Sequence, residues 1–231
     1  MLSARESFRR GRLTASPKTT VQTFEFKTGI QPLRLDFTRD GMVYIPTSYT
    51  HKQPCPLVVM LHGAGGAAEH GLNLLMQYAD DQHLLLLAPA SRVNTWDVIV
   101  KNTFNSDVIF IDEALSLVFE RYNIDVKHIA IGGFSDGASY ALSLGLSNGD
   151  LFTHIIAFSP GFYHTIENKG YPNIFISHGV KDKILPIAPC SRRIVPRLKR
   201  LRHNIRYEEF QGEHEIPQDV SVAAINWFLK S

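Results

Sequence analysis

The sequence has only two cysteines, Cys55 and Cys190, among its 231 residues. Two cysteines are too few for a disulfide framework, and neither stands in the Cys/His spacing of a structural zinc site. An excess of charge of one sign is also lacking, because 24 Lys and Arg residues face 22 Asp and Glu residues. We therefore expect neither nucleic acid nor an anionic membrane as a partner.

Long hydrophobic runs are missing as well. The longest nearly uninterrupted apolar stretch, Leu84 to Ala90, is far shorter than the roughly 20 residues of a transmembrane helix. Residues 1–18 contain four arginines and no apolar run, which is typical of neither a secretory signal nor an anchor. We expect no stable membrane insertion and, by default, a cytoplasmic location.

With 44% hydrophobic residues, a chain of this length can bury one full core. Residues 1–20 carry charge without apolar periodicity and predict a flexible basic arm, so residues 21–231 are expected to form a single domain. Apolar residues alternate from Phe24 and again over residues 33–37, and Arg39-Asp40-Gly41 predicts a hairpin turn into a strand over residues 42–45. These patterns predict antiparallel strands at the start of the domain.

The pattern then changes to short continuous apolar runs. They occupy residues 56–61, 84–87, 128–131, 154–158 and 173–176. Such runs indicate strands buried on both faces, and the amphipathic segments between them indicate helices. The expected fold is a mostly parallel sheet flanked by helices on both faces, with its ligand site at the carboxyl ends of the strands. Only about 15 residues separate the last two runs, too few for a helical cap domain.

A G-x-S-x-G pattern lies between a predicted strand and a predicted helix, in Gly133-Phe134-Ser135-Asp136-Gly137. In this context the motif predicts a tight turn that presents the Ser135 hydroxyl as a nucleophile. A plain glycine-containing turn is the alternative for the motif taken alone. The Asp136 side chain is expected to cap the helix or to bond locally.

An earlier strand is followed by Leu61-His62-Gly63-Ala64-Gly65-Gly66. The backbone N–H groups of Ala64 and Asp136 are the expected oxyanion hole, in which each donor contributes on the order of 3 kcal/mol to the transition state. His62 has no partner at metal-ligand spacing, so a role in shaping the loop is favoured over metal binding or general-base catalysis.

The serine needs a base, and in this fold the expected chain order is serine, acid, histidine. Asp182 follows the strand over residues 173–176, and His214 lies between an expected strand at 207–210 and the final helix. We therefore predict a triad of Ser135, Asp182 and His214. A solvated aspartate and a surface histidine are the alternatives for each residue alone. His178 precedes the acid and is expected to be structural.

These residues resemble the phospholipase/carboxylesterase family of α/β hydrolases, with similarity to dienelactone-hydrolase-like and polyhydroxybutyrate-depolymerase-like esterases. The resemblance spans roughly residues 30–230 and implies the α/β-hydrolase fold without a cap domain. The segments that carry it are residues 61–66, 132–139, 158–161, 178–182 and 212–217. Dienelactone hydrolases carry a cysteine where this chain has Ser135, which favours ordinary ester hydrolysis. The absence of an export signal argues against extracellular polymer degradation.

Apolar residues at the strand ends predict the walls of a substrate pocket: Trp96, Phe162, Tyr163 and Leu185. Core packing is an equally good interpretation of the aromatic ones. We expect a cofactor-free and metal-free serine esterase that cuts small-molecule esters through an acyl-enzyme. A thioesterase or lysophospholipase on the same triad, or a non-catalytic binding protein with the same fold, are the alternatives. The sequence does not indicate the oligomeric state.

Overall fold

A computed structural model describes residues 3–18 and 25–230. In them eight strands form one sheet with the order β1-β2-β4-β3-β5-β6-β7-β8. The strands are β1 (Gly29–Pro32), β2 (Met42–Ile45), β3 (Cys55–Leu61), β4 (Leu85–Ala88), β5 (Ile124–Phe134), β6 (His154–Phe158), β7 (Asn173–Gly179) and β8 (Ile205–Phe210). β1, β2 and β4 pair antiparallel, and the pairs from β4 to β8 are parallel. The predicted sheet is therefore confirmed.

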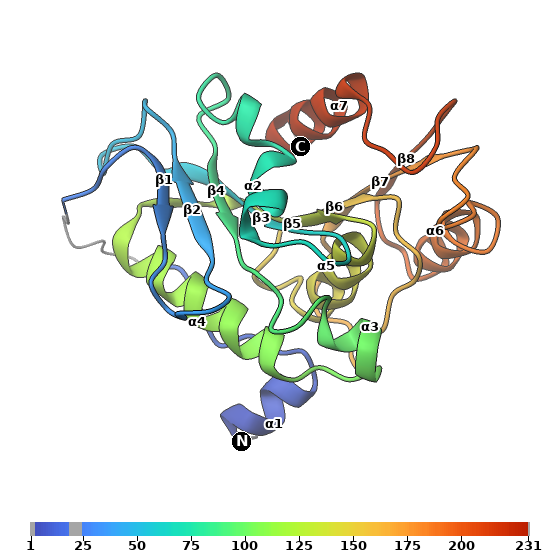
Figure 1. Cartoon of the computed structure of the whole chain (residues 1–231), viewed down its shortest axis with the longest axis horizontal. Helices are drawn as coiled ribbons and strands as arrows, with labels where there is room; N and C mark the ends of the chain where they lie inside the picture. Colours follow the sequence, from blue (N-terminus) through green and yellow to red (C-terminus); the bar gives the residue numbers. More distant parts are fainter. Residues whose placement is uncertain (1–2, 19–24, 231) are drawn as a thin grey trace.

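Helices cover both faces of this sheet (Figure 1). They are α1 (Ala4–Arg9), α2 (Ala68–Asn73), the 3₁₀ helix η1 (Met76–Tyr78), α3 (Asp97–Lys101), α4 (Ser106–Arg121), α5 (Asp136–Ser147), α6 (Ser191–Arg200) and α7 (Gln218–Lys230). Strand β3, which is buried except at Pro56, divides its side chains between two hydrophobic clusters. Leu57 packs in one cluster with α4, α5 and α6, and Val58 packs in the other with α2 and α7. Alternation along the strand thus builds a core on each face.

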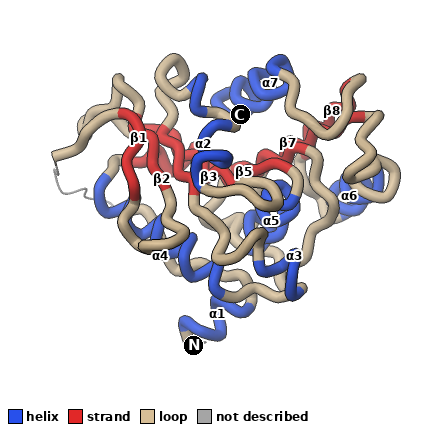
Figure 2. The backbone as a smooth tube through the Cα atoms, in the orientation of Figure 1, coloured by secondary structure: helices blue, strands red, loops and turns tan. Residues whose placement is uncertain are grey.

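The segment between β6 and β7, residues 159–172, contains no helix. The structure therefore confirms the expected absence of a cap at this position, and Figure 2 shows the sheet with the helices and loops that surround it. None of the helices in residues 3–18 and 25–230 is both long and apolar enough to cross a bilayer.

One predicted strand is wrong. Residues 33–37 alternate in hydrophobicity, yet they form a loop between β1 and β2. The Asp40 carboxylate accepts the backbone N–H groups of Arg34 (2.7 Å) and Leu35 (3.1 Å), and Asp36 accepts those of Thr38 and Arg39. These amides are satisfied by side chains, so they are not available to a strand ladder. Phe24, where the alternation begins, lies outside the described residues.

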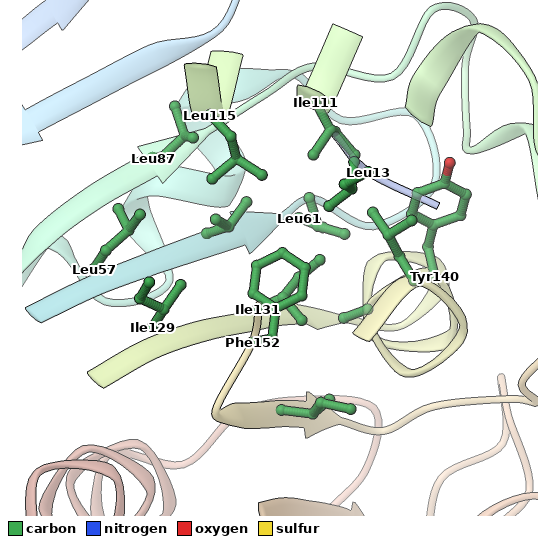
Figure 3. Close-up of a cluster of buried hydrophobic side chains, with 14 of the residues drawn as sticks. Leu13, Leu57, Leu61, Leu87, Ile111, Leu115, Ile129, Ile131, Tyr140 and Phe152 are labelled. Atoms are coloured by element: carbon green, nitrogen blue, oxygen red, sulfur yellow. The ribbon is translucent and has the colours of Figure 1, made fainter. Parts of the chain in front are cut away.

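The flexible arm expected over residues 1–20 also needs correction where the structure describes it. The Arg12 guanidinium forms a bidentate ion pair with Asp150 at 2.8 and 2.6 Å. Asp112 of α4 accepts the backbone N–H groups of Thr14 and Ala15. Leu13 is buried in the cluster between the sheet and α4 (Figure 3). Long-range bonds therefore dock this segment on the domain, which its local composition does not reveal.

Candidate active site

The turn between β5 and α5 holds Ser135 in a strained backbone conformation, with φ +57° and ψ −119°. Such a conformation costs about 1–3 kcal/mol for a residue other than glycine. Neighbouring glycines permit the turn: a Cβ on Gly133 would lie 2.6 Å from the Leu61 carbonyl oxygen, and one on Gly137 only 2.2 Å from it. β3, β5 and α5 thus approach too closely for any larger residue, which explains the two glycines of the motif.

Asp182 lies in the loop after β7, with its carboxylate inside the protein. One carboxylate oxygen accepts the backbone N–H groups of Ile184 (2.9 Å) and Leu185 (2.8 Å), and the other accepts from His214 Nδ1 at 2.6 Å. Burial alone would raise the pKa of Asp182, but the hydrogen bonds from His214 and Leu185 outweigh it and hold the pKa below its ordinary value. The carboxylate is therefore charged at neutral pH and oriented toward an imidazole.

His214 lies in the loop between β8 and α7, and its side chain is 15% exposed. Its ring packs against the ring of Phe134, the residue before Ser135, with 4.6 Å between the ring centroids. Backbone bonds hold this loop to the Asp182 loop, because the Lys181 N–H donates to the Gly212 carbonyl at 2.9 Å. The structure thus brings the predicted acid and base together beside the predicted nucleophile.

His178 supports the same carboxylate from inside the protein. Its Nε2–H group lies 2.7 Å from the Leu185 carbonyl oxygen and 3.2 Å from the Asp182 carboxylate, and Nδ1 accepts from the Ser191 hydroxyl at 2.7 Å. Burial lowers the pKa of His178, so the imidazole is neutral and can accept at Nδ1 while it donates at Nε2. The sequence predicted a structural residue, and its position in the chain did not reveal this contact with Asp182.

The loop over residues 62–66 passes next to the serine, because a Cβ on Gly63 would lie 3.5 Å from the Ser135 Cβ. His62 donates from Nδ1 to the Gly63 carbonyl (2.7 Å) and accepts the Ser91 N–H at Nε2 (3.0 Å). Arg39 clamps the loop further by donating to the Gly66 carbonyl at 2.7 Å. The His62 contacts match the loop-shaping role expected from sequence, whereas no local pattern indicates Arg39.

The second expected oxyanion donor, the Asp136 N–H, is the first amide of α5. The first amides of a helix have no acceptor within it and carry its positive dipole end. The Asp136 carboxylate accepts from the Thr95 hydroxyl at 2.6 Å, so its side chain is held by a distant loop rather than by the local bond expected. Thr95 therefore positions the residue after the nucleophile.

The four predicted pocket residues are in different surroundings. Trp96 is fully buried, where it stacks on Tyr140 and donates from its indole N–H to the His62 carbonyl at 2.9 Å. This places Trp96 behind the loop over residues 62–66, and its contact with substrate stays a prediction. Phe162 is 37% exposed, Tyr163 beside it is half-buried, and Leu185 packs against Gly161.

Within the described residues, no three His, Cys, Asp or Glu side chains cluster as ligands for a metal ion.

Comparison with known proteins decides the family. Residues 96–231 match the model of the phospholipase/carboxylesterase family. The chain belongs to this family. Its members act on esters, and the chain is a serine esterase by family.

Solved structures similar to this chain confirm the α/β-hydrolase fold. The S-formylglutathione hydrolase of Staphylococcus aureus is 16% identical with a TM-score of 0.68, over 90% of this chain and 100% of that one. The Bacillus cereus carboxylesterase is 19% identical with a TM-score of 0.63, over 84% and 95%. A phospholipase/carboxylesterase of Dyadobacter fermentans is 22% identical with a TM-score of 0.59, over 90% and 99%. At these identities the likeness concerns the fold of the esterase and not its substrate.

Proposed function

We propose that this esterase hydrolyses small carboxylic esters with Ser135 as nucleophile, His214 as general base and Asp182 as the carboxylate that orients the base. The observation that carries the proposal is the 2.6 Å hydrogen bond from His214 to Asp182, formed beside the strained turn that holds Ser135. A serine hydroxyl at its free pKa is a weak nucleophile, so an adjacent oriented base is what it needs.

The reaction follows from these roles. His214 Nε2 takes the Ser135 proton as Oγ attacks the ester carbonyl, and Asp182 stabilises the imidazolium through Nδ1–H. The tetrahedral intermediate collapses, His214 protonates the leaving alcohol, and an acyl-enzyme remains. A water molecule then gives a proton to His214 as its oxygen attacks the acyl carbon. When the second tetrahedral intermediate collapses and releases the acid, His214 returns that proton to Ser135 Oγ.

The oxyanion of both tetrahedral intermediates would be held by the N–H groups of Ala64 and Asp136. Support comes from the loop over residues 62–66, which is clamped by His62 and Arg39, and from the anchoring of Asp136 by Thr95. Donors held in place before the reaction need no reorganisation as charge develops, and each is worth on the order of 3 kcal/mol. Phe162, Tyr163 and Leu185 would line the acyl or aryl side.

The triad would serve thioesters and lysophospholipids as well as simple esters, because all three pass through an acyl-enzyme. Matched assays with short and medium p-nitrophenyl esters, an acyl thioester and a lysophospholipid separate these activities. A higher kcat/KM for one of these substrates identifies the substrate class.

The decisive test is mass spectrometry after incubation with a fluorophosphonate, which labels activated serines. We expect the wild type to gain one label and to hydrolyse p-nitrophenyl esters, and both Ser135→Ala and His214→Ala to lose the label and at least about 1,000-fold in kcat. A folded but unlabelled and inactive wild type would leave a binding protein and overturn the proposal.

A further inference from the structure

A small cavity of about 130 Å³ lies between the loop after β6 and the helix α6. Its walls are Gly161, Phe162, Tyr163, Pro189, Arg193, Ile194 and Arg197. Phe162, Pro189 and Ile194 make the lining largely apolar, and the two arginines supply its charge. No acidic residue lines the cavity, so its chemistry is that of a short apolar pocket with a cationic wall.

Arg193 and Arg197 are exposed and lie four residues apart on α6, which puts them on the same helical face. Like charges at this spacing destabilise a helix. Arg192 of the same helix is already neutralised by Glu209, at 2.9 and 2.7 Å. Within residues 3–18 and 25–230, the ion pairs include neither Arg193 nor Arg197.

The cavity adjoins the nucleophile turn through Gly161. The Gly161 N–H donates to Ser139 Oγ at 2.9 Å, and this hydroxyl donates to the Ser135 carbonyl at 3.2 Å. From the other side, the Leu185 side chain approaches Gly161, with 3.3 Å to the position of an added Cβ. Leu185 is three residues beyond Asp182, so Gly161 lies between the serine turn and the acid loop.

The volume limits what could enter. A whole small-molecule pocket typically measures about 300–1,000 Å³, so a cavity of about 130 Å³ fits only one end of a substrate. Guanidinium groups form paired, charge-assisted hydrogen bonds with carboxylates and are well suited to that end. The apolar side chains of Phe162 and Ile194 would contact the carbons that lead to it.

We propose that this cavity is an anion subsite, and that the enzyme prefers short esters carrying a carboxylate a few carbons from the ester bond over neutral esters of the same length. This inference rests on the proposed function, because the preference concerns turnover at Ser135. Arg193 and Arg197 are specificity-determining residues that bind the carboxylate without taking part in the chemistry.

The test compares monomethyl glutarate with methyl pentanoate, which has the same chain length without the carboxylate, by titrating the acid released. A second pair, the acetate ester of γ-hydroxybutyrate and butyl acetate, places the carboxylate on the alcohol side. We expect the wild type to favour the anionic member of one pair by at least about tenfold in kcat/KM, which is the scale of a charged hydrogen bond. The pair that shows the preference identifies the side of the ester bond.

The variants then attribute this preference. The double variant Arg193→Gln/Arg197→Gln is expected to lower the ratio of kcat/KM values by about tenfold. Arg200→Gln removes the same charge from the same helix outside the cavity and is the matched control, with a wild-type ratio. Added salt should lower the wild-type ratio, because the arginines are exposed to solvent. A wild-type ratio near one for both pairs would overturn the subsite.

Binding to Ser135→Ala protein keeps the two proposals distinguishable. We expect calorimetric titration to show that Ser135→Ala protein binds glutarate. Adding the two substitutions Arg193→Gln and Arg197→Gln to this protein should weaken binding by about tenfold, and adding Arg200→Gln should leave it unchanged. If glutarate binds in this way while the wild type is unlabelled by the fluorophosphonate and inert toward all four esters, the proposed function fails and the subsite stands. If the wild type is labelled and active, but Ser135→Ala protein binds glutarate equally well with and without the two arginines, the subsite fails and the proposed function stands.

Discussion

Two regions of the molecule, one at an end of the sheet and one within it, each hold a histidine hydrogen-bonded to an aspartate at the same distance. His214 Nδ1 lies 2.6 Å from Asp182, and His128 Nδ1 lies 2.6 Å from Asp125. The first pair is at the carboxyl ends of β7 and β8. The second lies along β5, seven positions before Ser135 and therefore roughly 20 Å from it at the usual rise of a strand.

The surroundings of the two pairs differ. His214 packs beside the serine turn, with the loop over residues 62–66 close to that turn. His128 instead stacks on the buried His154, with ring centroids 6.3 Å apart and ring planes 5° apart. A histidine-aspartate bond by itself therefore does not identify a catalytic site. The strained serine and the available backbone N–H groups distinguish the pair beside Ser135.

Replacing the two aspartates should separate these regions most strongly. Asp182→Asn is expected to lower kcat by about 10³–10⁴-fold, because the amide neither holds His214 in the required tautomer nor stabilises its charged form. Asp125→Asn makes the same change in the other pair and should leave kcat at the wild-type value. Steady-state ester hydrolysis measures both. An equal loss in the two variants would mean that the geometry of the pair, and not its surroundings, matters.

His178 gives a smaller effect that bears on how the acid is held. His178→Phe removes the donor to Asp182 and Leu185, so we expect kcat to fall about ten- to a hundredfold through misplacement of the carboxylate. KM should stay unchanged, because His178 does not line the substrate side. His178→Gln, which restores a donor, should recover part of kcat.

The matched control is His203→Phe, at a second buried histidine near the end of α6. It should change the free energy of unfolding without changing kcat. If His178→Phe also altered only stability, measured by urea denaturation, the contact with Asp182 would have no part in positioning the carboxylate.

The smallest effect concerns stability at His154, the buried histidine that stacks on His128 of the second pair. Burial, and then the neighbouring His128, lower the pKa of His154 to about 4 from 6.5. Between these values the unfolded chain binds a proton that the folded protein does not. This contribution to the free energy of unfolding is therefore complete above pH 6.5 and is lost as the pH falls toward 4.

Urea denaturation at pH 8 and pH 5 measures this difference, which should amount to about 2 kcal/mol for His154. In His154→Gln the stability should depend less on pH by that amount, because no imidazole remains to titrate at this position. His214→Gln, at the pair beside Ser135, should retain the wild-type dependence on His154. Equal pH dependence in the wild type and His154→Gln would contradict the assignment.

Much of the fold follows from local patterns. Continuous apolar runs predicted the strands β3 to β7, because a strand buried on both faces must be apolar throughout. The strand over residues 33–37 was wrong, because the Asp40 side chain accepts the amides of Arg34 and Leu35. Asp36 in the same way accepts the amides of the next two residues, Thr38 and Arg39. The arm was misjudged for a similar reason: the partners of Arg12 and Thr14 are more than 90 residues away in the chain, and composition does not encode them.

By itself the sequence determined the parallel sheet, the serine turn and the order of the three candidate catalytic residues. Each depends on neighbours in the chain: apolar periodicity, glycines on both sides of Ser135, and loops that must follow strands. Only the tertiary structure decided that His178 bonds to Asp182, that Arg39 clamps the loop over residues 62–66, and that Arg193 and Arg197 face a cavity next to Gly161. These contacts join residues from separate elements, and their distances are set by how the helices and loops pack on the sheet.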